Sequence, residues 1–139
     1  MLVFVKVITD TAVIAALGAS AFIVFAMPNT DAASPRKLVG GNIVGLLCGT
    51  SCYFLFLTGP VASAIPAWEH TLWVVSAFVI GFSIFLMTIT NTEHPPAASI
   101  ALGMVIGRWS YEVFLFVLVY SVCLAVIKFG LKRFLIDLF

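Results

Sequence analysis

Asn91-Thr92-Glu93-His94-Pro95-Pro96 decides how the chain is divided, because it interrupts an otherwise apolar second half with polar side chains and two prolines. Paired prolines are typical of the first turn of a helix, where their missing N–H is not needed. A proline also disfavours helical geometry in the residue before it, so the preceding helix is expected to end at or before Glu93. A helix of small residues is predicted to follow. The segment is then either a solvated loop with a helix cap, or a half-helix whose positive N-terminus faces a ligand.

The composition is that of an integral membrane protein. Hydrophobic residues make up 63% of the 139 positions and charged residues only 9%, and the mean hydropathy is +1.19. Ordinary soluble domains carry roughly 25% charged residues. The lipid bilayer is therefore the expected partner of most of the surface. A formal net charge of +1 argues against nucleic acid as a partner.

Apolar runs of bilayer length predict an all-α fold, a polytopic membrane helix bundle of four spans in a single domain covering 1–139. The spans are expected at about 3–27, 38–58, 72–90 and 113–131. A crossing helix needs about 20 residues at 1.5 Å each. The segment 97–107 reaches only about 16 Å, half a bilayer. We expect it to be a short re-entrant half-helix before a separate last span, rather than part of one long tilted helix with a buried Arg108–Glu112 pair.

Small residues predict close contacts between helices. The first span contains Gly18-Ala19-Ser20-Ala21, and the second contains glycines at positions 40, 41, 45 and 49. Small side chains let helix backbones approach each other in a membrane. So many of them in so small a bundle predict a homo-oligomer or a subunit of a larger membrane complex. Asn42 is the one amide expected at membrane depth in the second span, where it either bonds a neighbouring helix or contacts a ligand.

Two segments of the chain resemble each other and suggest an internal repeat. Residues 25–31 and 87–93 each end an apolar helix with Asn-Thr and an acidic residue. A proline follows each copy, Pro35 or Pro95, and opens a helix rich in glycine or alanine. Two expected crossings separate the two loops, so both should lie on the same membrane face. The repeat would then be parallel, about an axis normal to the bilayer.

The run from Asn91 to Ala98, together with Gly18-Ala19-Ser20-Ala21-Phe22 and Pro35-Arg36…Gly40-Gly41, resembles the HPP family of small integral membrane proteins. That family is named for a His-Pro-Pro motif, here His94, Pro95 and Pro96. The resemblance implies four transmembrane helices and, since some members are implicated in nitrite transport, a transport function. This chain departs from the family pattern at Asn42, where a histidine commonly follows the Gly-Gly pair.

A small-anion site is the function that the polar residues favour. Two proline-started helices would aim free N–H groups and positive dipole ends at one face, each end equivalent to roughly half a positive charge. Arg36 and Lys37 add charge at the first helix start, and His94 is a titratable group at the second. Asp31 and Glu93 oppose an anion; they cap the helices, pair with Arg36 or Lys37, or carry a coupling proton. The candidate substrate-binding residues are His94, Pro95, Pro96, Arg36, Asn42 and Glu93, with His94, Arg36 and Asn42 expected to line one polar site.

Two functions therefore remain, a transporter or channel for a small nitrite-like anion and, as the alternative, a structural or accessory subunit that transports nothing. An enzyme is not expected, because the chain shows neither a nucleophile with a base at workable spacing nor a cofactor loop. Cys48, Cys52 and Cys123 lack metal-ligand and redox spacing, so no catalytic residue, cofactor or metal is predicted.

The distribution of basic residues predicts the orientation in the membrane. With four spans, Arg36 and Lys37 share a face with the His-Pro-Pro loop, whereas the opposite face carries Lys6, Lys128, Lys132 and Arg133. Basic residues are more frequent on the cytoplasmic side. Both termini are therefore predicted to be cytoplasmic, in an inner membrane of bacterial or archaeal type, with the His-Pro-Pro loop outside.

Overall fold

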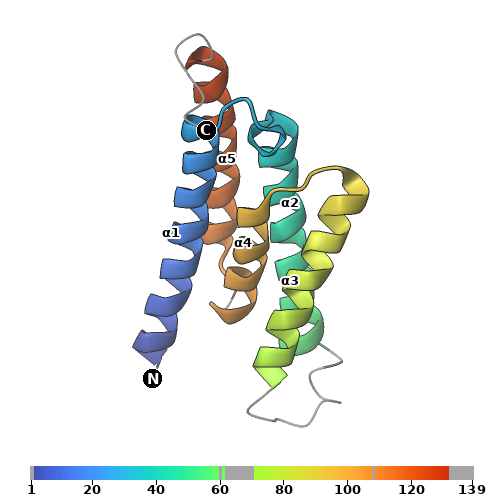
Figure 1. The fold of residues 1–139 in the computed structure, drawn as a ribbon. Coiled ribbons are helices and arrows are strands. Elements are labelled where there is room, and N and C mark those ends of the chain that lie inside the picture. Colours follow the sequence, from blue (N-terminus) through green and yellow to red (C-terminus); the bar gives the residue numbers. More distant parts are fainter. Residues whose placement is uncertain (1, 60, 62–70, 108, 132–139) are drawn as a thin grey trace.

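The computed structural model describes residues 2–59, 61, 71–107 and 109–131, and side-chain environments from residue 11 onward. All regular elements in these ranges are helical, so the predicted all-α class is confirmed (Figure 1). They are α1 (Leu2–Ala26), the short 3₁₀ turn η1 (Asp31–Ala33), α2 (Pro35–Cys52) with its π-helical continuation η2 (Tyr53–Thr58), α3 (Thr71–Thr90), α4 (Pro95–Ile106) and α5 (Tyr111–Leu131).

Three of the described helices are long and apolar enough to cross a membrane, as judged by length and composition. They are Pro35–Thr58, Thr71–Thr90 and Tyr111–Leu131, and they match the predicted second, third and last spans to within a few residues. The backbone of α1 is helical over 25 residues, and Thr11–Ala26 is an apolar part of it. At 1.5 Å per residue, 25 residues extend about 37 Å, which is enough for a fourth crossing.

The short helix α4 is the central element of the bundle and packs against α1, α2 and α3 (Figure 1). Its closest contact is with a glycine face of α2. A Cβ atom on Gly45 would lie 2.4 Å from the Ala97 carbonyl oxygen, and one on Gly49 would lie 2.6 Å from the Ala101 carbonyl oxygen. Side chains larger than hydrogen do not fit there without moving backbone. The predicted close contact of the glycine-rich span is therefore confirmed, and α4 is the helix that makes it.

The two proline-started helices run side by side in the same direction. Gly41 of α2 lies against His94, and the next glycines along α2 lie against Ala97 and Ala101 of α4. Residue numbers rise together on both sides, so α2 and α4 are parallel. Both helices carry proline in the first turn. This arrangement agrees with the predicted parallel repeat, in which Pro35 and Pro95 open matching helices.

The predicted placement of the two ends of the bundle is wrong. Val13 and Val117 belong to one apolar cluster, and Val24 and Leu124 belong to another. Residue numbers thus rise in the same direction along both helices, so α1 and α5 are parallel. The start of α1 and the end of α5 therefore lie at opposite ends of the bundle (Figure 1). The Lys128 ammonium donates to the Ala33 carbonyl at 2.6 Å, so it shares the η1 face instead of opposing it. Lys132 and Arg133 lie outside the described residues.

The reason for this error is the path of the chain after the His-Pro-Pro motif. The prediction treated 97–107 as re-entrant, entering and leaving by one face. Instead α4 runs away from the motif, and the ring of Trp109 just after it packs on Phe54 with a centroid distance of 5.4 Å, near the far end of α2. The chain then returns through α5 itself. α4 is short, with 12 residues, and separate from α5, as predicted. The alternative pair with Glu112 involves Arg108, which lies outside the described residues.

Candidate functional site

His94 is buried at the point where three elements meet. An Asn91 residue in the left-handed region (φ 53°) ends α3, a conformation that asparagine tolerates better than most residues. The chain then runs extended to His94, the N-cap of α4. The imidazole is fully inaccessible to solvent. Its Nε2 lies 2.9 Å from the Ser20 hydroxyl on α1, and its Nδ1 lies 3.3 Å from the Ala32 carbonyl oxygen in η1.

A glycine on α2 makes this position possible. A Cβ atom on Gly41 would lie 2.5 Å from the His94 Cβ, so no larger residue fits beside the histidine. Gly41 is six residues beyond Pro35, which is about 9 Å along α2. His94 therefore lies inside the bundle rather than on a solvated loop. Burial lowers the pKa of His94 below its ordinary value, and the bond to the Ala32 carbonyl offsets part of this effect.

The proline pair starts α4 as predicted, but it does not present free N–H groups. Pro95 and Pro96 have no N–H to offer, and the Ala97 N–H donates to the His94 carbonyl at 2.9 Å. The expectation that this helix start offers backbone N–H groups to an anion is therefore wrong. Pro96 is buried while Pro95 is exposed, so one ring packs inside the bundle and both fix the backbone that carries His94.

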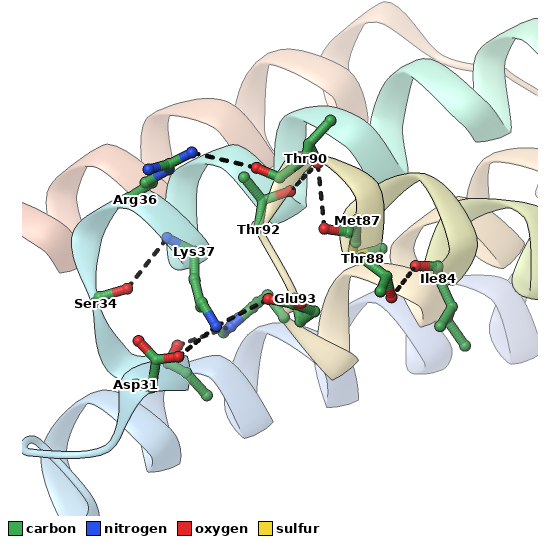
Figure 2. Close-up of polar contacts among 12 residues, drawn as sticks. Asp31, Ser34, Arg36, Lys37, Ile84, Met87, Thr88, Thr90, Thr92 and Glu93 are labelled. Carbon is green, nitrogen blue, oxygen red and sulfur yellow. Dashed lines mark hydrogen bonds and ion pairs between the residues drawn. The ribbon is translucent and has the colours of Figure 1, made fainter.

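Charged side chains gather just outside His94. The Lys37 ammonium pairs with the Asp31 carboxylate and with Glu93 Oε2, the latter at 2.8 Å (Figure 2). We call Asp31, Lys37 and Glu93 the ionic cluster. Pairing with Lys37 was one of the predicted roles of the two acids, and it joins the loops of both repeat copies. The hydrogen bond from Lys37 lowers the pKa of Glu93, as does a backbone hydrogen bond. Arg36 is exposed, and its guanidinium donates to the Thr90 carbonyl at 3.3 Å.

Asn42 lies on a different face of α2 and is also fully buried. Its Nδ2 donates to the Ser121 hydroxyl at 2.7 Å, and that hydroxyl donates to the Val117 carbonyl of its own helix at 2.7 Å. A bond to a neighbouring helix was one of the two predicted roles. The amide oxygen Oδ1 is buried and has no hydrogen-bond partner among the residues that the structure describes. One acceptor of this amide is thus available for a donor that the described residues do not supply.

Four buried polar residues lie at a similar depth, and we call them the polar layer: Ser20, Asn42, His94 and Ser121. Along α1, α2 and α5, three of them separate two apolar clusters. Val24, Leu38 and Leu124 form the cluster nearer the η1 face. The cluster on the other side includes Leu17, Leu46 and Val117. The middle of the bundle is therefore polar at one level and apolar above and below it.

Comparison with known proteins places the chain in a family. A family model described as the HPP transmembrane region matches residues 1–135. The chain belongs to the HPP transmembrane family. A transmembrane protein of Dictyostelium discoideum is 32% identical over 111 residues, which is 78% of this chain and 36% of that protein. The chain thus spans about a third of the length of this relative. No solved structure matches the chain.

As an HPP family member with apolar helices of bilayer length, the protein is an integral membrane protein in contact with lipid. Of its predicted site residues, His94 and Asn42 are buried in the polar layer, whereas Arg36 is exposed at the η1 face. The hydrogen bonds of these three residues go to different partners. In the described parts of the chain, no group of three His, Cys, Asp or Glu residues is arranged to hold a metal ion.

Sequence reasoning missed two members of the HPP protein's polar layer. The sequence pattern assigns Ser20 only to a small-residue packing patch and does not distinguish Ser121. Neighbours of Ser20 in that patch, Gly18 and Ala19, are exposed, and a Cβ atom on Gly18 would meet nothing within 4 Å. The available signal was the position of each serine in the middle of a long apolar helix.

Proposed function

We propose that this HPP protein is a transporter or channel for a small monovalent anion of the size of nitrite, in an inner membrane of bacterial or archaeal type. The observation that carries the proposal is the polar layer, four buried polar side chains at one level of an otherwise apolar bundle. In that layer the Asn42 oxygen lacks a partner in the described part of the chain, but as an acceptor it would not bind the anion; the donor end of the amide, Nδ2, would. Leaving a buried polar atom unpaired costs about 1–3 kcal/mol. Polar groups inside membrane helices are costly and commonly mark the path of a solute.

The positive charge for an anion would come from side chains, since the start of α4 has no free N–H. Arg36 is exposed at the η1 face and would attract the anion there. Lys37 is neutralised by Asp31 and Glu93, so Glu93 would act by keeping that lysine from holding the anion too tightly. His94, positioned by Pro95 and Pro96, would meet the anion next, and the donor Nδ2 of Asn42 would contact it deeper in the bundle.

Uptake of nitrite into proteoliposomes tests this proposal. We expect uptake above that of protein-free liposomes at mildly acidic pH. Asn42→Leu makes the layer apolar at one position and should reduce the rate by at least about tenfold, the equivalent of 1.4 kcal/mol. Ser83→Ala is the matched control, because Ser83 is equally buried but, among the described residues, its hydroxyl donates to the Ile80 carbonyl of its own helix, α3. Equal rates for wild type and protein-free liposomes would contradict the proposal.

The second candidate is a structural or accessory subunit of a larger membrane complex, or a homo-oligomer without transport. It is favoured by the small face of α1, where Gly18 and Ala19 are exposed and leave room for another backbone. Co-purification with other membrane proteins at a fixed stoichiometry, combined with absent nitrite uptake, would support this candidate over the first.

A further inference from the structure

We infer that His94 and Ser20 form a proton-binding site in which the imidazole gains and loses a proton while the heavy atoms stay in place. The Ser20 hydroxyl turns between two acceptors as this happens. The inference deepens the proposed function. Proton binding by His94 stands on its own, and only the coupling of that proton to anion transport rests on the proposed function. The ligand is a proton, and the site consists of His94, Ser20 and the carbonyl groups of Ala16 and Ala32.

The neutral histidine satisfies every group at this site. In the tautomer that carries the proton on Nδ1, the ring donates to the Ala32 carbonyl, 3.3 Å away. The other ring nitrogen, Nε2, is then an acceptor. The Ser20 hydroxyl lies 2.9 Å from it and donates to it. The Ala16 carbonyl does not receive the Ser20 hydroxyl in this state, but it still accepts the helical hydrogen bond from the N–H four residues further along α1.

The protonated histidine is equally satisfied without any displacement. Both ring nitrogens then carry a proton. Nδ1–H still donates to Ala32, and Nε2–H donates to the Ser20 oxygen. The hydroxyl proton of Ser20 turns to the Ala16 carbonyl, which lies 3.0 Å from the same oxygen. A ring nitrogen that faced a backbone N–H could not do this, because such a partner can only donate.

The charges around the site nearly balance each other. Asp31 from η1 and Glu93 beside His94 are negative, while Lys37 from α2 and Lys128 from α5 are positive. The further positive group on α2, Arg36, is exposed to solvent, which screens it. The described parts of α1, α3 and α4 with assigned side chains contain no charged residue. Burial therefore dominates, and it lowers the pKa of His94. The histidine is neutral at pH 7 and takes up a proton in more acidic conditions.

Protonation of His94 would place a positive charge inside the bundle, and this charge is present only at acidic pH. Lys37 cannot supply that charge, because two carboxylates already compensate it. An anion reaching the polar layer would thus be neutralised by the imidazolium and would move together with a proton. Ala32, whose carbonyl accepts from the ring, is the neighbour in sequence of Asp31, whose side chain is 80% exposed. The η1 face is therefore the side from which a proton would reach His94.

Imidazole NMR of the full-length chain in lipid nanodiscs, with ¹⁵N-labelled histidine, tests the site directly. A His70→Asn background leaves His94 as the single histidine. We expect one reversible titration with a midpoint below 6.5, the ordinary histidine value, and unchanged backbone amide shifts in α1 and η1. A ring that never titrates in the folded protein, or a titration that displaces these amides, would overturn the inference.

Ser20→Ala tests the role of the hydroxyl. It leaves Nε2 without a partner in either state, and the loss is worse for the charged ring. We expect the midpoint to fall by about one pH unit, a tenfold weaker proton affinity. Ser83→Ala, which removes an equally buried serine hydroxyl from α3, should leave the midpoint unchanged. An unchanged midpoint in Ser20→Ala would refute the site, and the wild-type titration decides the matter if this variant does not fold.

The two proposals fail in different ways. If His94 titrates as expected, with a midpoint below 6.5, and nitrite uptake is absent, transport is refuted and the proton site is supported. Nitrite uptake that is intact and independent of pH, in a protein whose His94 does not titrate, refutes the proton site and leaves transport standing.

Discussion

Replacing Gly45 by alanine should separate the two parallel helices at the centre of the bundle. The added Cβ atom would lie 2.4 Å from the Ala97 carbonyl oxygen and 3.1 Å from its carbonyl carbon, both backbone atoms that cannot rotate away. Ordinary contacts begin at 3.4 Å, so the distance to the oxygen has to grow by 3.4 − 2.4 = 1.0 Å. The shift is transmitted along α4, because Gly41 and Gly49 are packed on the same helix.

The size of the effect follows from two opposing terms. Overpacking a tight contact costs typically 1–3 kcal/mol, while alanine is favoured over glycine inside a helix by about 1 kcal/mol. The net loss in the free energy of unfolding therefore lies between roughly 0 and 2 kcal/mol. We expect the upper part of this range, because the atoms that have to move are backbone atoms. Gly81→Ala in α3 is the control, because a Cβ atom there meets nothing within 4 Å and only the helix preference remains.

Reversible unfolding of the protein in lipid bicelles by a denaturing detergent would measure both variants. Gly45→Ala should unfold at a lower denaturant fraction than wild type, and Gly81→Ala at an equal or higher one. If Gly45→Ala were as stable as Gly81→Ala, the reasoning about the α2–α4 contact would be refuted.

Three further predictions concern His94, the proline pair and Gly18. Because burial lowers the pKa of His94, the unfolded chain binds more protons than the folded protein below pH 6.5. The free energy of unfolding should therefore fall as the pH drops below that value, by at most about 1.4 kcal/mol per pH unit. Unfolding curves between neutral and mildly acidic pH would measure this change, and a flat profile would contradict it. Replacing Pro95 and Pro96 together by alanine should free the backbone before α4, let α3 extend past Thr92 and reduce the yield of folded protein. Recovery from size-exclusion chromatography and protease access to the loop would measure these effects, and unchanged values would count against an architectural role of the prolines. Gly18→Leu should leave the unfolding of the single chain nearly unchanged but weaken any oligomer that uses this face of α1. Native mass spectrometry in nanodiscs would detect the loss of subunits. An oligomer with the same number of subunits as wild type does not use this face.

Much of the fold could be predicted because the responsible signals are local. The length of an apolar run sets a crossing helix, and a proline pair sets a helix start within one or two residues. The glycines of α2 predicted a close contact, although not that its partner would be α4. Pairing of Lys37 with the two acids was foreseeable from charge alone. These features depend on neighbours in sequence or on the bilayer, and not on the details of packing.

The rest depended on contacts between residues far apart in the chain. The burial of His94 requires Ser20, 74 positions earlier, and the hydrogen in place of a side chain at Gly41. A loop rich in polar residues gave no sign of this, so an exposed loop and a buried site were equally compatible with the sequence. The predicted direction of α5 was wrong for a similar reason. The sequence does not determine whether a short α4 ends inside the bundle or near its far end, and this decides on which face the basic residues after α5 lie.

The two kinds of polarity in the bundle have different consequences for function. At the η1 face, the ionic cluster and Arg36 carry permanent charges, but Lys37 is already compensated and Arg36 is in contact with water. Inside the bundle, the polar layer carries no permanent charge, and its one titratable group, His94, is neutral at pH 7. An anion therefore finds attraction at the surface and none in the interior unless His94 binds a proton. If the protein transports an anion, this difference requires that the proton be bound first, so uptake should increase as the pH on the η1 side falls.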